Sequence, residues 1–568
     1  MRNKELAEIF DRIADALEFK GEMVFRVLAY RKAARVLDDL VEDVEVLHQD
    51  GKLDELPGIG AGIAKKVVEY LETGKMKKYK EVTKGIPESL LKMLDIQNLG
   101  PKTLSLANKK LRVKTLADLK RVIASGKLAQ LPQMGEKKVE NIRKGIESYE
   151  KGHERLSIAV AEKVATEIIT YMKDNTEIKD ISPAGSLRRW KETIGDVDIL
   201  VTGKDGAKIV KVFTKYPNTE RVLAGGDTKG SIMVEGGVQV DLRIVEPRSY
   251  GAAMQYFTGS KAHNVRCRNI ARTKGMKLSE YGLFKGEKMV AGRTEAEVYN
   301  LLGLGYMPPE LREDRGEIEA ALKKKLPRLV ELKQIRGDLQ MHSRYSDSAA
   351  TIVQLADFAA SLNYEYILIT DHSQSAKYAH GLEIERLHKQ WKEIDKLNKK
   401  SKVRVLKGIE VDILKDGKLD YPDKILKQLD LVVASIHQGF AKNVTERIFA
   451  AMDNPYVDII GHPTGRLISS REGYILDLHK VMEKAVETGT WLELNAYWDR
   501  LDLSDVNLRA AKEMGIKISI GTDAHDLKGL LWMKFGVATA RRGWLEPKNV
   551  VNTYPAKKLL ASRKIHGK

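Results

Sequence analysis

Three aspartates, Asp196, Asp198 and Asp241, have the type and spacing needed to bind divalent cations. Asp196 and Asp198 are separated by one residue, so their side chains share one face if the segment is a strand. Asp241 lies in a second strand-like run and can supply a third carboxylate. Oxygen ligands of this kind suit Mg²⁺ or Mn²⁺. Two such ions could activate a primer 3′-hydroxyl and stabilise a leaving pyrophosphate.

A glycine-serine turn, Gly185-Ser186, precedes the paired aspartates. Its backbone N–H groups and its hydroxyl could bind a triphosphate, and Arg189 could add a charge-assisted, bidentate hydrogen bond. An Asp-x-Asp pair alone is more often a solvated strand end. The turn upstream and the third aspartate downstream favour a nucleotide site over that alternative.

The second half of the chain is rich in histidine, with nine of the 12 histidines after Arg336. Apolar, β-rich runs alternate there with helical segments, which predicts a parallel α/β barrel whose C-terminal strand ends form the site. Imidazole and carboxylate ligands together suit Zn²⁺, Mn²⁺ or Fe²⁺ better than Ca²⁺, and such ions could activate water against a phosphate ester. The candidate ligands at these strand ends are His372, Glu410, His437, His462, Asp523 and His525.

A short glycine-containing pattern recurs three times near the N-terminus, at residues 56–60, 96–100 and 131–135, each time before a lysine-bearing helix. Glycines let a loop backbone approach closely, so its N–H groups and the next helix N-terminus could hold a DNA phosphate without reading sequence. An ordinary glycine-capped turn is the alternative for one copy; three copies in a basic chain favour DNA binding. The glycines concerned are Gly58, Gly60, Gly100 and Gly135.

Composition supports a polyanionic partner. The chain has 568 residues, with 97 Lys and Arg against 79 Asp and Glu, a net charge of +18. A basic excess is typical of nucleic-acid binding, although a soluble surface would also explain it. The single cysteine, Cys267, excludes a disulfide framework and a cysteine-based zinc site. The first 25 residues lack a continuous apolar run, so we expect no signal peptide and no membrane span. Together with the single cysteine, this favours a cytoplasmic protein.

The motif Gly185-Ser186 with Asp196-Val197-Asp198 resembles the nucleotidyltransferase superfamily. The segment Tyr256-Phe257-Thr258-Gly259-Ser260 is similar to that of the family X DNA polymerases, which include polymerase beta, and the resemblance covers about residues 1–309. It implies that Asp196, Asp198 and Asp241 are catalytic metal ligands. The residues that it implies for nucleotide binding are Gly185, Ser186, Arg189, Tyr256, Phe257, Gly259 and Asn264.

The same resemblance assigns roles around the nascent base pair. Tyr256 and Phe257 would crowd a ribose 2′-hydroxyl and disfavour ribonucleotides, because substrate selection needs steric contacts at that position. Asn264 would contact the incoming base and Arg268 the template. Arg243 would lie beside the third aspartate. Core packing is the alternative for the aromatic pair.

Lys66 follows the first glycine pattern at the position of the family's Schiff-base lysine. An amine that attacks an abasic-site aldehyde needs a depressed pKa, and clustered Lys65 and Lys66 would help to lower it. Phosphate binding is the alternative role for this side chain. The resemblance therefore implies a possible lyase activity in the N-terminal helices.

Residues 332–568 resemble a PHP domain (polymerase and histidinol phosphatase). The resemblance adds His342 to the metal ligands at the strand ends, and it makes Asp347 and His380 further candidates. The family begins with His-x-His, but this chain has Gln340-Met341-His342. A neutral amide is a weaker ligand than imidazole for borderline metals. We therefore expect one metal position to be weakened.

Together these patterns predict a multidomain chain with an all-α helix–hairpin–helix region, an α+β nucleotidyltransferase palm and a C-terminal α/β distorted TIM-like barrel. We expect a monomeric gap-filling DNA polymerase that acts on gapped or nicked DNA and dNTPs, with 3′-5′ exonuclease or abasic-site endonuclease activity in the barrel. The alternatives are a small-molecule phosphatase with an accessory front half and a DNA-binding scaffold with inactive sites. The expected boundaries are 1–85 for a lyase-like domain, 86–154 for a second helix–hairpin–helix region, 155–246 for the palm, 247–315 for a nascent-base-pair subdomain, 316–334 for a linker and 335–568 for the PHP domain. We expect the charged stretch 310–325 at this boundary to be a solvated helix. A family X polymerase followed by a PHP domain is the usual bacterial and archaeal arrangement, so the resemblance implies a prokaryotic protein.

Overall fold

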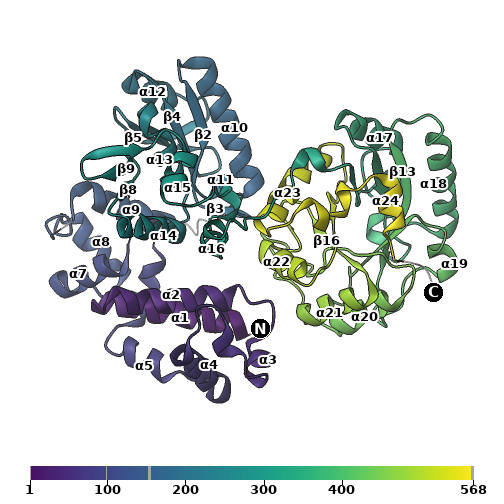
Figure 1. Cartoon of the computed structure of the whole chain (residues 1–568), viewed down its shortest axis with the longest axis horizontal. Coiled ribbons are helices and arrows are strands. Elements are labelled where there is room, and N and C mark those ends of the chain that lie inside the picture. Colours follow the sequence, from purple (N-terminus) through teal and green to yellow (C-terminus); the bar gives the residue numbers. More distant parts are fainter. Residues whose placement is uncertain (1, 97–98, 133, 151–154, 565–568) are drawn as a thin grey trace. The chain divides into compact units, whose positions relative to one another are not determined.

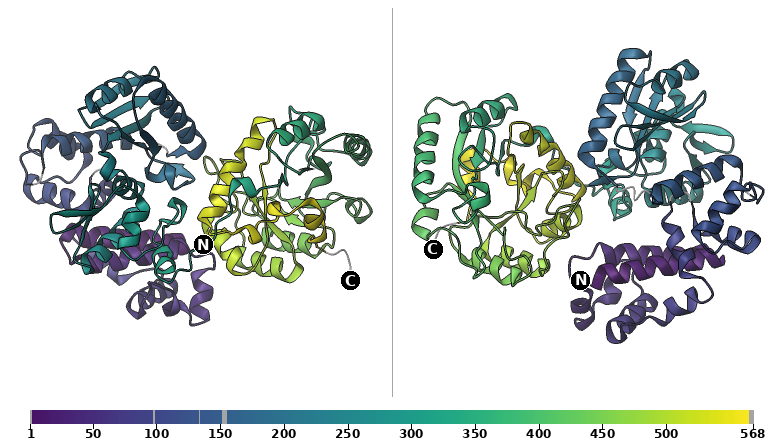
Figure 2. Two further views of the ribbon diagram at one scale, coloured as in Figure 1. Left: turned by 45° about the horizontal axis from the view of Figure 1, so that its top comes forward. Right: turned by 180° about the vertical axis from the view of Figure 1, so that it is seen from behind.

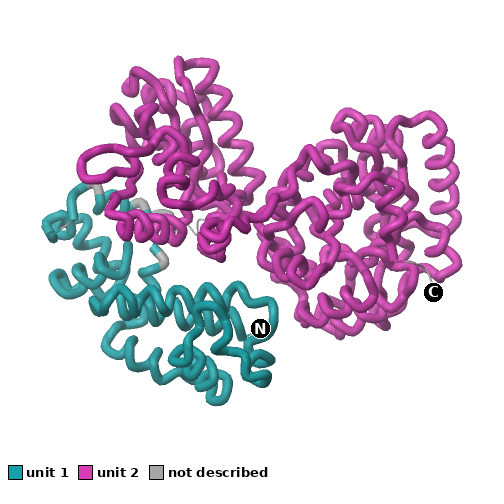
Figure 3. The backbone as a smooth tube through the Cα atoms, viewed as in Figure 1, with its two compact units in different colours: residues 1–154 teal, residues 155–568 magenta. Residues whose placement is uncertain are grey.

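The computed structural model describes residues 2–96, 99–132, 134–150 and 155–564. It divides into two compact units, Met1–Glu154 and Arg155–Lys568, which Figure 3 shows in different colours. Throughout the described ranges, every helix is too short or too polar to cross a lipid bilayer.

Unit 1 is all-α. Its two longest N-terminal helices, α1 and α2, pack side by side, with the ring of Phe10 stacked on that of Tyr30 at 5.9 Å between centroids (Figure 1). Apolar side chains at helical spacing give each helix one buried face, and these faces form a single core. The helices are α1 (Arg2–Lys20), α2 (Val24–Asp38), α3 (Val44–Gln49), α4 (Ala61–Thr73), α5 (Lys77–Thr83), α6 (Glu88–Lys92), α7 (Pro101–Leu111), α8 (Leu116–Ala124) and α9 (Glu136–Glu150).

The three glycine patterns each lead into a helix. Gly60 caps the N-terminus of α4, Gly100 caps that of α7, and Gly135 immediately precedes α9. Gly58 has a φ of +111°, a left-handed conformation that favours glycine. Residues 97, 98 and 133 of the second and third patterns lie outside the described residues.

The first part of unit 2 is an α+β domain built on a five-stranded sheet of order β2-β4-β7-β6-β5. Helix α10 (Ile158–Asn175) runs along this sheet (Figure 1), and with α12 (Gly206–Phe213) it contributes to the same hydrophobic core. Strands β4 and β7 are parallel neighbours. The strands are β2 (Asp180–Pro183), β4 (Val197–Thr202), β5 (Thr219–Gly225), β6 (Lys229–Val234) and β7 (Val238–Ile244).

Helices and a small sheet follow. The three-stranded sheet has the order β10-β9-β8, and a cis peptide bond joins Gly259 to Ser260 between α13 and α14. The elements are α13 (Tyr250–Thr258), α14 (Lys261–Thr273), β8 (Lys277–Ser279), β9 (Gly282–Lys285), β10 (Lys288–Ala291), α15 (Glu295–Leu301) and α16 (Glu317–Leu322).

The expectation that the charged stretch 310–325 is solvated is wrong for its central residues. Arg312 and Glu317 are fully buried. Arg312 pairs with Glu295 at 2.6 Å, and Glu317 accepts from His263 at 2.8 Å. Each buried charge therefore has a partner, as burial requires.

The rest of unit 2 is a parallel seven-stranded barrel, in the order β11 to β17. It is nearly closed, because Leu339 N–H donates to Ile520 C=O across the gap. The strands read as apolar runs because both of their faces are buried. Figure 2 shows helices surrounding the strands. The strands are β11 (Gly337–Asp338), β12 (Tyr366–Ile369), β13 (Arg404–Asp412), β14 (Leu431–Ser435), β15 (Ile459–Ile460), β16 (Trp491–Asn495) and β17 (Ile518–Gly521).

The helices of the barrel follow the strands in the alternation that the sequence predicts. They are α17 (Ile352–Ser361), α18 (Ile384–Leu397), α19 (Asp423–Leu426), α20 (Val444–Asp453), α21 (Leu478–Thr488), α22 (Asp505–Glu513), α23 (Met533–Arg542) and α24 (Ala556–Ala561).

Candidate active sites

Asp196, Asp198 and Asp241 lie together at the end of the palm sheet. Ligand oxygens of the three carboxylates fall within 4.8 Å of one another. Asp198 on β4 lies directly opposite Asp241 on β7 in the parallel register. Burial, followed by the charges of Asp196 and Asp241, raises the pKa of Asp198 to about 7. Ionisation of all three carboxylates is unfavourable without a counter-ion, so the cluster is suited to bind cations.

The Gly185-Ser186 turn rests against this cluster. Gly185 has a φ of +61°, and a Cβ at this position would lie 2.5 Å from the Asp198 Oδ2 atom. Ala184 N–H also donates to the Asp198 carbonyl at 2.8 Å. Only glycine allows the turn to approach the carboxylate so closely. The backbone of helix α11 (Gly185–Arg188) thus begins beside the metal-binding oxygens.

Arg189 makes contacts within the protein. Its Nε donates to Glu313 Oε1 at 3.0 Å, and its Nη1 donates to the Thr258 carbonyl. A Cβ added at Gly259 would lie 3.0 Å from that Nη1 atom. The guanidinium therefore holds the turn after α13, and an incoming triphosphate would have to share it with these partners.

The predicted base-pair residues occupy α13 and α14. Tyr256 and Phe257 pack edge to face, with 5.1 Å between ring centroids, and the Arg243 guanidinium lies 4.5 Å from the Phe257 centroid. Asn264 donates to the Tyr256 carbonyl at 2.6 Å. Arg268 is one helical turn further along α14 and is exposed. Asn264 is thus tied to α13, whereas Arg268 is free to reach a template strand.

Lys66 lies on α4, in the turn after Gly60. Its Nζ donates to the Gly62 carbonyl at 2.6 Å. Burial, followed by the charge of Lys78, lowers the pKa of Lys66. A lysine that loses its proton more easily is a better nucleophile near neutral pH.

The barrel brings its predicted ligands together at the C-terminal ends of the strands. Ligand atoms lie within 4.8 Å of one another in two groups: His342, Asp347, His372 and His525; and His372, Glu410 and His437. The other two predicted ligands adjoin these groups: His462 Nε2 is 3.1 Å from Glu410 Oε1, and Asp523 Oδ1 is 3.0 Å from His342 Nε2. His380 belongs to neither group of described residues.

Carboxylates raise the pKa of His437 and His525, whereas burial lowers the pKa of His342 and His462. Burial lowers the pKa of His437, but the charge of Glu410 and the hydrogen bond to Asp412 outweigh it and raise that pKa to about 10. His525 likewise has its pKa raised to about 9, against burial, by its hydrogen bond to Asp347 and by Asp523. A metal ion must displace these protons, because only a neutral imidazole can ligate.

Gln340 faces the same cluster without completing it. The side chain is buried, and its Nε2 donates to Glu410 Oε1 at 3.1 Å. Its Oε1 is buried without a hydrogen-bond partner. The amide thus presents a donor to the carboxylate. A donor N–H₂ group is not a metal ligand, so the Gln340 Oε1 atom is the only atom of this side chain that could ligate, and a neutral amide oxygen is a weaker ligand than imidazole for borderline metals.

Sequence reasoning missed two residues that orient the barrel ligands. Asp412 Oδ1 lies 2.6 Å from His437 Nδ1, and Asn495 Nδ2 donates to Asp523 Oδ2 at 3.1 Å. Asp412 was detectable, because it is two residues beyond Glu410 and shares its face of β13. Such hydrogen bonds fix the orientation of ligand side chains.

Comparison with known proteins agrees with this geometry. The chain is 40% identical over 560 residues, 97% of both chains, to the DNA polymerase/3′-5′ exonuclease PolX of Bacillus subtilis (strain 168). The chain belongs to the family X DNA polymerases. It is also 27% identical to DNA polymerase lambda of Rattus norvegicus over 342 residues, 55% of this chain and 56% of that protein.

Family models match four segments of this family X chain. They are a helix-hairpin-helix domain at residues 1–76, a SAM-like helix-hairpin-helix tandem at 90–148, a DNA polymerase beta thumb at 253–313 and a PHP domain at 338–496. A probable phosphatase of Thermoanaerobacter sp. (strain X514) is 41% identical over 137 residues, 22% of this chain and 53% of that protein. The matches confirm the predicted fold class: helix–hairpin–helix regions, a polymerase beta-like core and a C-terminal PHP barrel.

Proposed function

We propose that this family X polymerase fills short gaps in DNA during base-excision repair or end processing, with gapped or nicked DNA and dNTPs as substrates. The observation that supports this best is the cluster of Asp196, Asp198 and Asp241 against the Gly185-Ser186 turn. Three carboxylates beside a phosphate-binding turn suit two-metal nucleotidyl transfer.

Each group in the palm has a distinct part. Asp196, Asp198 and Asp241 would hold Mg²⁺ or Mn²⁺, which supplies Lewis-acid activation of the 3′-hydroxyl and neutralises phosphate charge. The N–H groups that begin α11 and the Ser186 hydroxyl would bind the triphosphate. Tyr256 would exclude a 2′-hydroxyl by its bulk.

We propose that the barrel hydrolyses phosphodiester bonds at DNA 3′ ends or abasic sites. Its mixed ligands fit Mn²⁺, Zn²⁺ or Fe²⁺, which would supply an activated water. Asp412 would hold the His437 imidazole in the orientation that ligation needs. Asn495 would do the same for Asp523.

One assay of the full chain separates the two activities. Primer extension and primer degradation are measured on a single-nucleotide gap and on a 3′ overhang, with Mg²⁺ or Mn²⁺. Asp198→Asn is expected to lose only extension, and His437→Ala only degradation. Normal primer extension by Asp198→Asn, or normal primer degradation by His437→Ala, would refute the corresponding assignment. Hydrolysis of a phosphomonoester by the wild type, with DNA left intact, would instead support a small-molecule phosphatase.

A lyase activity is a second candidate, supported by the lowered pKa of Lys66. The amine would attack the C1′ aldehyde of a 5′-deoxyribose phosphate and form an imine with loss of water. β-Elimination would then remove a C2′ proton and break the C3′–O bond, and the downstream DNA would leave with its 5′-phosphate. Borohydride reduces such an imine to a stable amine. Trapping of the wild-type chain on incised abasic-site DNA tests the activity directly.

A further inference from the structure

The barrel site contains an arginine, Arg500, that is not one of the predicted metal ligands. Arg500 lies in the loop after β16, and its side chain is 17% exposed. Its Nε is 3.5 Å from Asp523 Oδ2, and its charge also acts on Glu410. The guanidinium therefore faces the same carboxylates that line the metal groups.

Two of its N–H groups are unsatisfied. Arg500 Nε and Nη1 are buried and have no hydrogen-bond partner. The nearby Asp523 Oδ2 is too distant for a good hydrogen bond and already accepts from Asn495 Nδ2 at 3.1 Å. Buried donors of a charged group are costly to leave unpaired, so their persistence calls for an acceptor from outside the chain.

The backbone holds Arg500 firmly in this position. Arg500 N–H donates to the Tyr497 carbonyl at 2.8 Å, and Arg466 Nε donates to the Arg500 carbonyl at 2.9 Å. Asn495 and Asp502 exchange backbone hydrogen bonds at the base of the loop. The backbone from which the Arg500 side chain extends is thus fixed before any ligand arrives, so binding need not order this loop.

We propose that Arg500 binds the non-bridging oxygens of the phosphoryl group that the barrel hydrolyses. The inference rests on the proposed hydrolytic function. A guanidinium presents parallel N–H donors that match phosphate oxygens, and it keeps its charge at every physiological pH. The predicted metal ligands lie beside Arg500, and the ions that they would hold would supply the activated water.

Gln340 makes this charge more important in this chain. The neutral Gln340 amide and His462 both contact Glu410 Oε1, so this corner is held by hydrogen bonds. Arg500 is a permanent cation beside the neighbouring carboxylates. It would attract phosphate at a site where the resembling family has an imidazole and this chain has Gln340.

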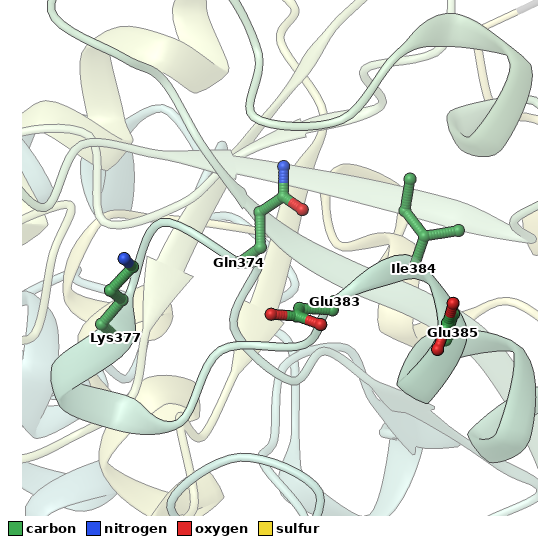
Figure 4. Close-up of a pocket in the computed structure, with 5 residues that line it drawn as sticks. All are labelled: Gln374, Lys377, Glu383, Ile384 and Glu385. Carbon is green, nitrogen blue, oxygen red and sulfur yellow. The ribbon is translucent and has the colours of Figure 1, made fainter.

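The competing explanation is that Arg500 only neutralises Asp523 and Glu410. A counter-ion would affect metal loading, whereas a phosphate ligand would affect anion affinity. Lys377 is a matched control for general attraction, because it is an exposed cation on the loop after β12. It lines a surface pocket of about 370 Å³ together with Gln374, Glu383, Ile384 and Glu385 (Figure 4).

The test compares wild type, Arg500→Met, Arg500→Lys and Lys377→Met as full chains loaded with Mn²⁺. Inorganic phosphate binding is measured by calorimetry, metal content by mass spectrometry, and KM and kcat with the p-nitrophenyl ester of thymidine 5′-monophosphate. Arg500→Met should weaken phosphate binding and raise KM by about 10- to 100-fold, the range for a hydrogen bond to a charged group. Arg500→Lys should fall between, and Lys377→Met should stay within about twofold.

Bound Mn²⁺ per chain should be the same in all four proteins. Unchanged phosphate affinity in Arg500→Met, or no phosphate binding by the wild type, would overturn the proposal. Altered metal content with unchanged affinity would establish the counter-ion role instead. Phosphate binding through Arg500 without turnover of the ester would leave this inference standing and refute the hydrolytic function. Thermal unfolding of each variant guards against misfolding, and Arg500→Lys keeps the test informative if Arg500→Met does not fold.

Discussion

Asp198→Asn removes a charge that the metal-free palm holds at a cost. The pKa of Asp198 is raised from 3.8 to about 7 by burial and by Asp196 and Asp241. A folded-state pKa above the unfolded value means that ionisation destabilises the fold: the cost is absent below pH 4, grows with pH and is complete above pH 7. The shift of about 3 units corresponds to at most ~4 kcal/mol.

The metal-free variant should therefore be more stable than the wild type at pH 8, with a gain that shrinks towards pH 5. Calorimetry in EDTA at both pH values measures this gain. With Mg²⁺ present, the lost ligand should lower single-turnover incorporation on gapped DNA by about 10³-fold or more, equivalent to ~4 kcal/mol of activation free energy. DNA binding, measured by anisotropy, should change little.

Asp227→Asn is the matched control, because Asp227 is an exposed carboxylate of the same domain, in the turn between β5 and β6. It should alter neither stability nor incorporation. Near wild-type extension by Asp198→Asn would show that the polymerase site is misplaced. Equal stability of metal-free wild type and metal-free Asp198→Asn at pH 8 would refute the electrostatic reasoning.

Three further predictions follow from the other sites. DNA affinity should fall with salt at a slope of log K against log salt of about −3 or steeper, if each of the three predicted hairpins contacts at least one phosphate; a flat titration would exclude these contacts. Lys66→Ala should abolish borohydride trapping on abasic-site DNA while Lys65→Ala retains it, and undiminished trapping would assign the imine to another amine. His437→Ala should abolish both metal retention and DNA hydrolysis in the barrel, whereas Gln340→His should raise both; a Gln340→His protein with unchanged metal content would show that imidazole is not what the site lacks.

Strand alternation allowed the palm site to be predicted from sequence. The segments that contain Asp198 and Asp241 were expected to be strands, and the two residues lie in β4 and β7. Once these strands pair in parallel, Asp198 and Asp241 must meet. The barrel ligands were predictable for a similar reason, because parallel strands end at one edge of a sheet.

Long-range pairing of charges was not predictable. The segment around Glu317 is polar enough to read as solvated, and only the fold brings it against His263, 54 residues away. Strand β16, which leads to Asn495 and Arg500, was also missed. A charged residue can be buried when a residue distant in sequence pairs with it, so local composition alone does not predict its burial.

The two sites solve the same electrostatic problem differently. The palm clusters carboxylates only, so without cations burial, followed by the charges of Asp196 and Asp241, raises the pKa of Asp198. The barrel pairs acids with imidazoles, which raises the pKa of His437 to about 10 and that of His525 to about 9. Metal binding to the barrel must therefore release imidazole protons, whereas binding to the palm releases at most a carboxylic proton. Acidification should thus empty the barrel before the palm, since His437 and His525 bind their protons more tightly than Asp198 does.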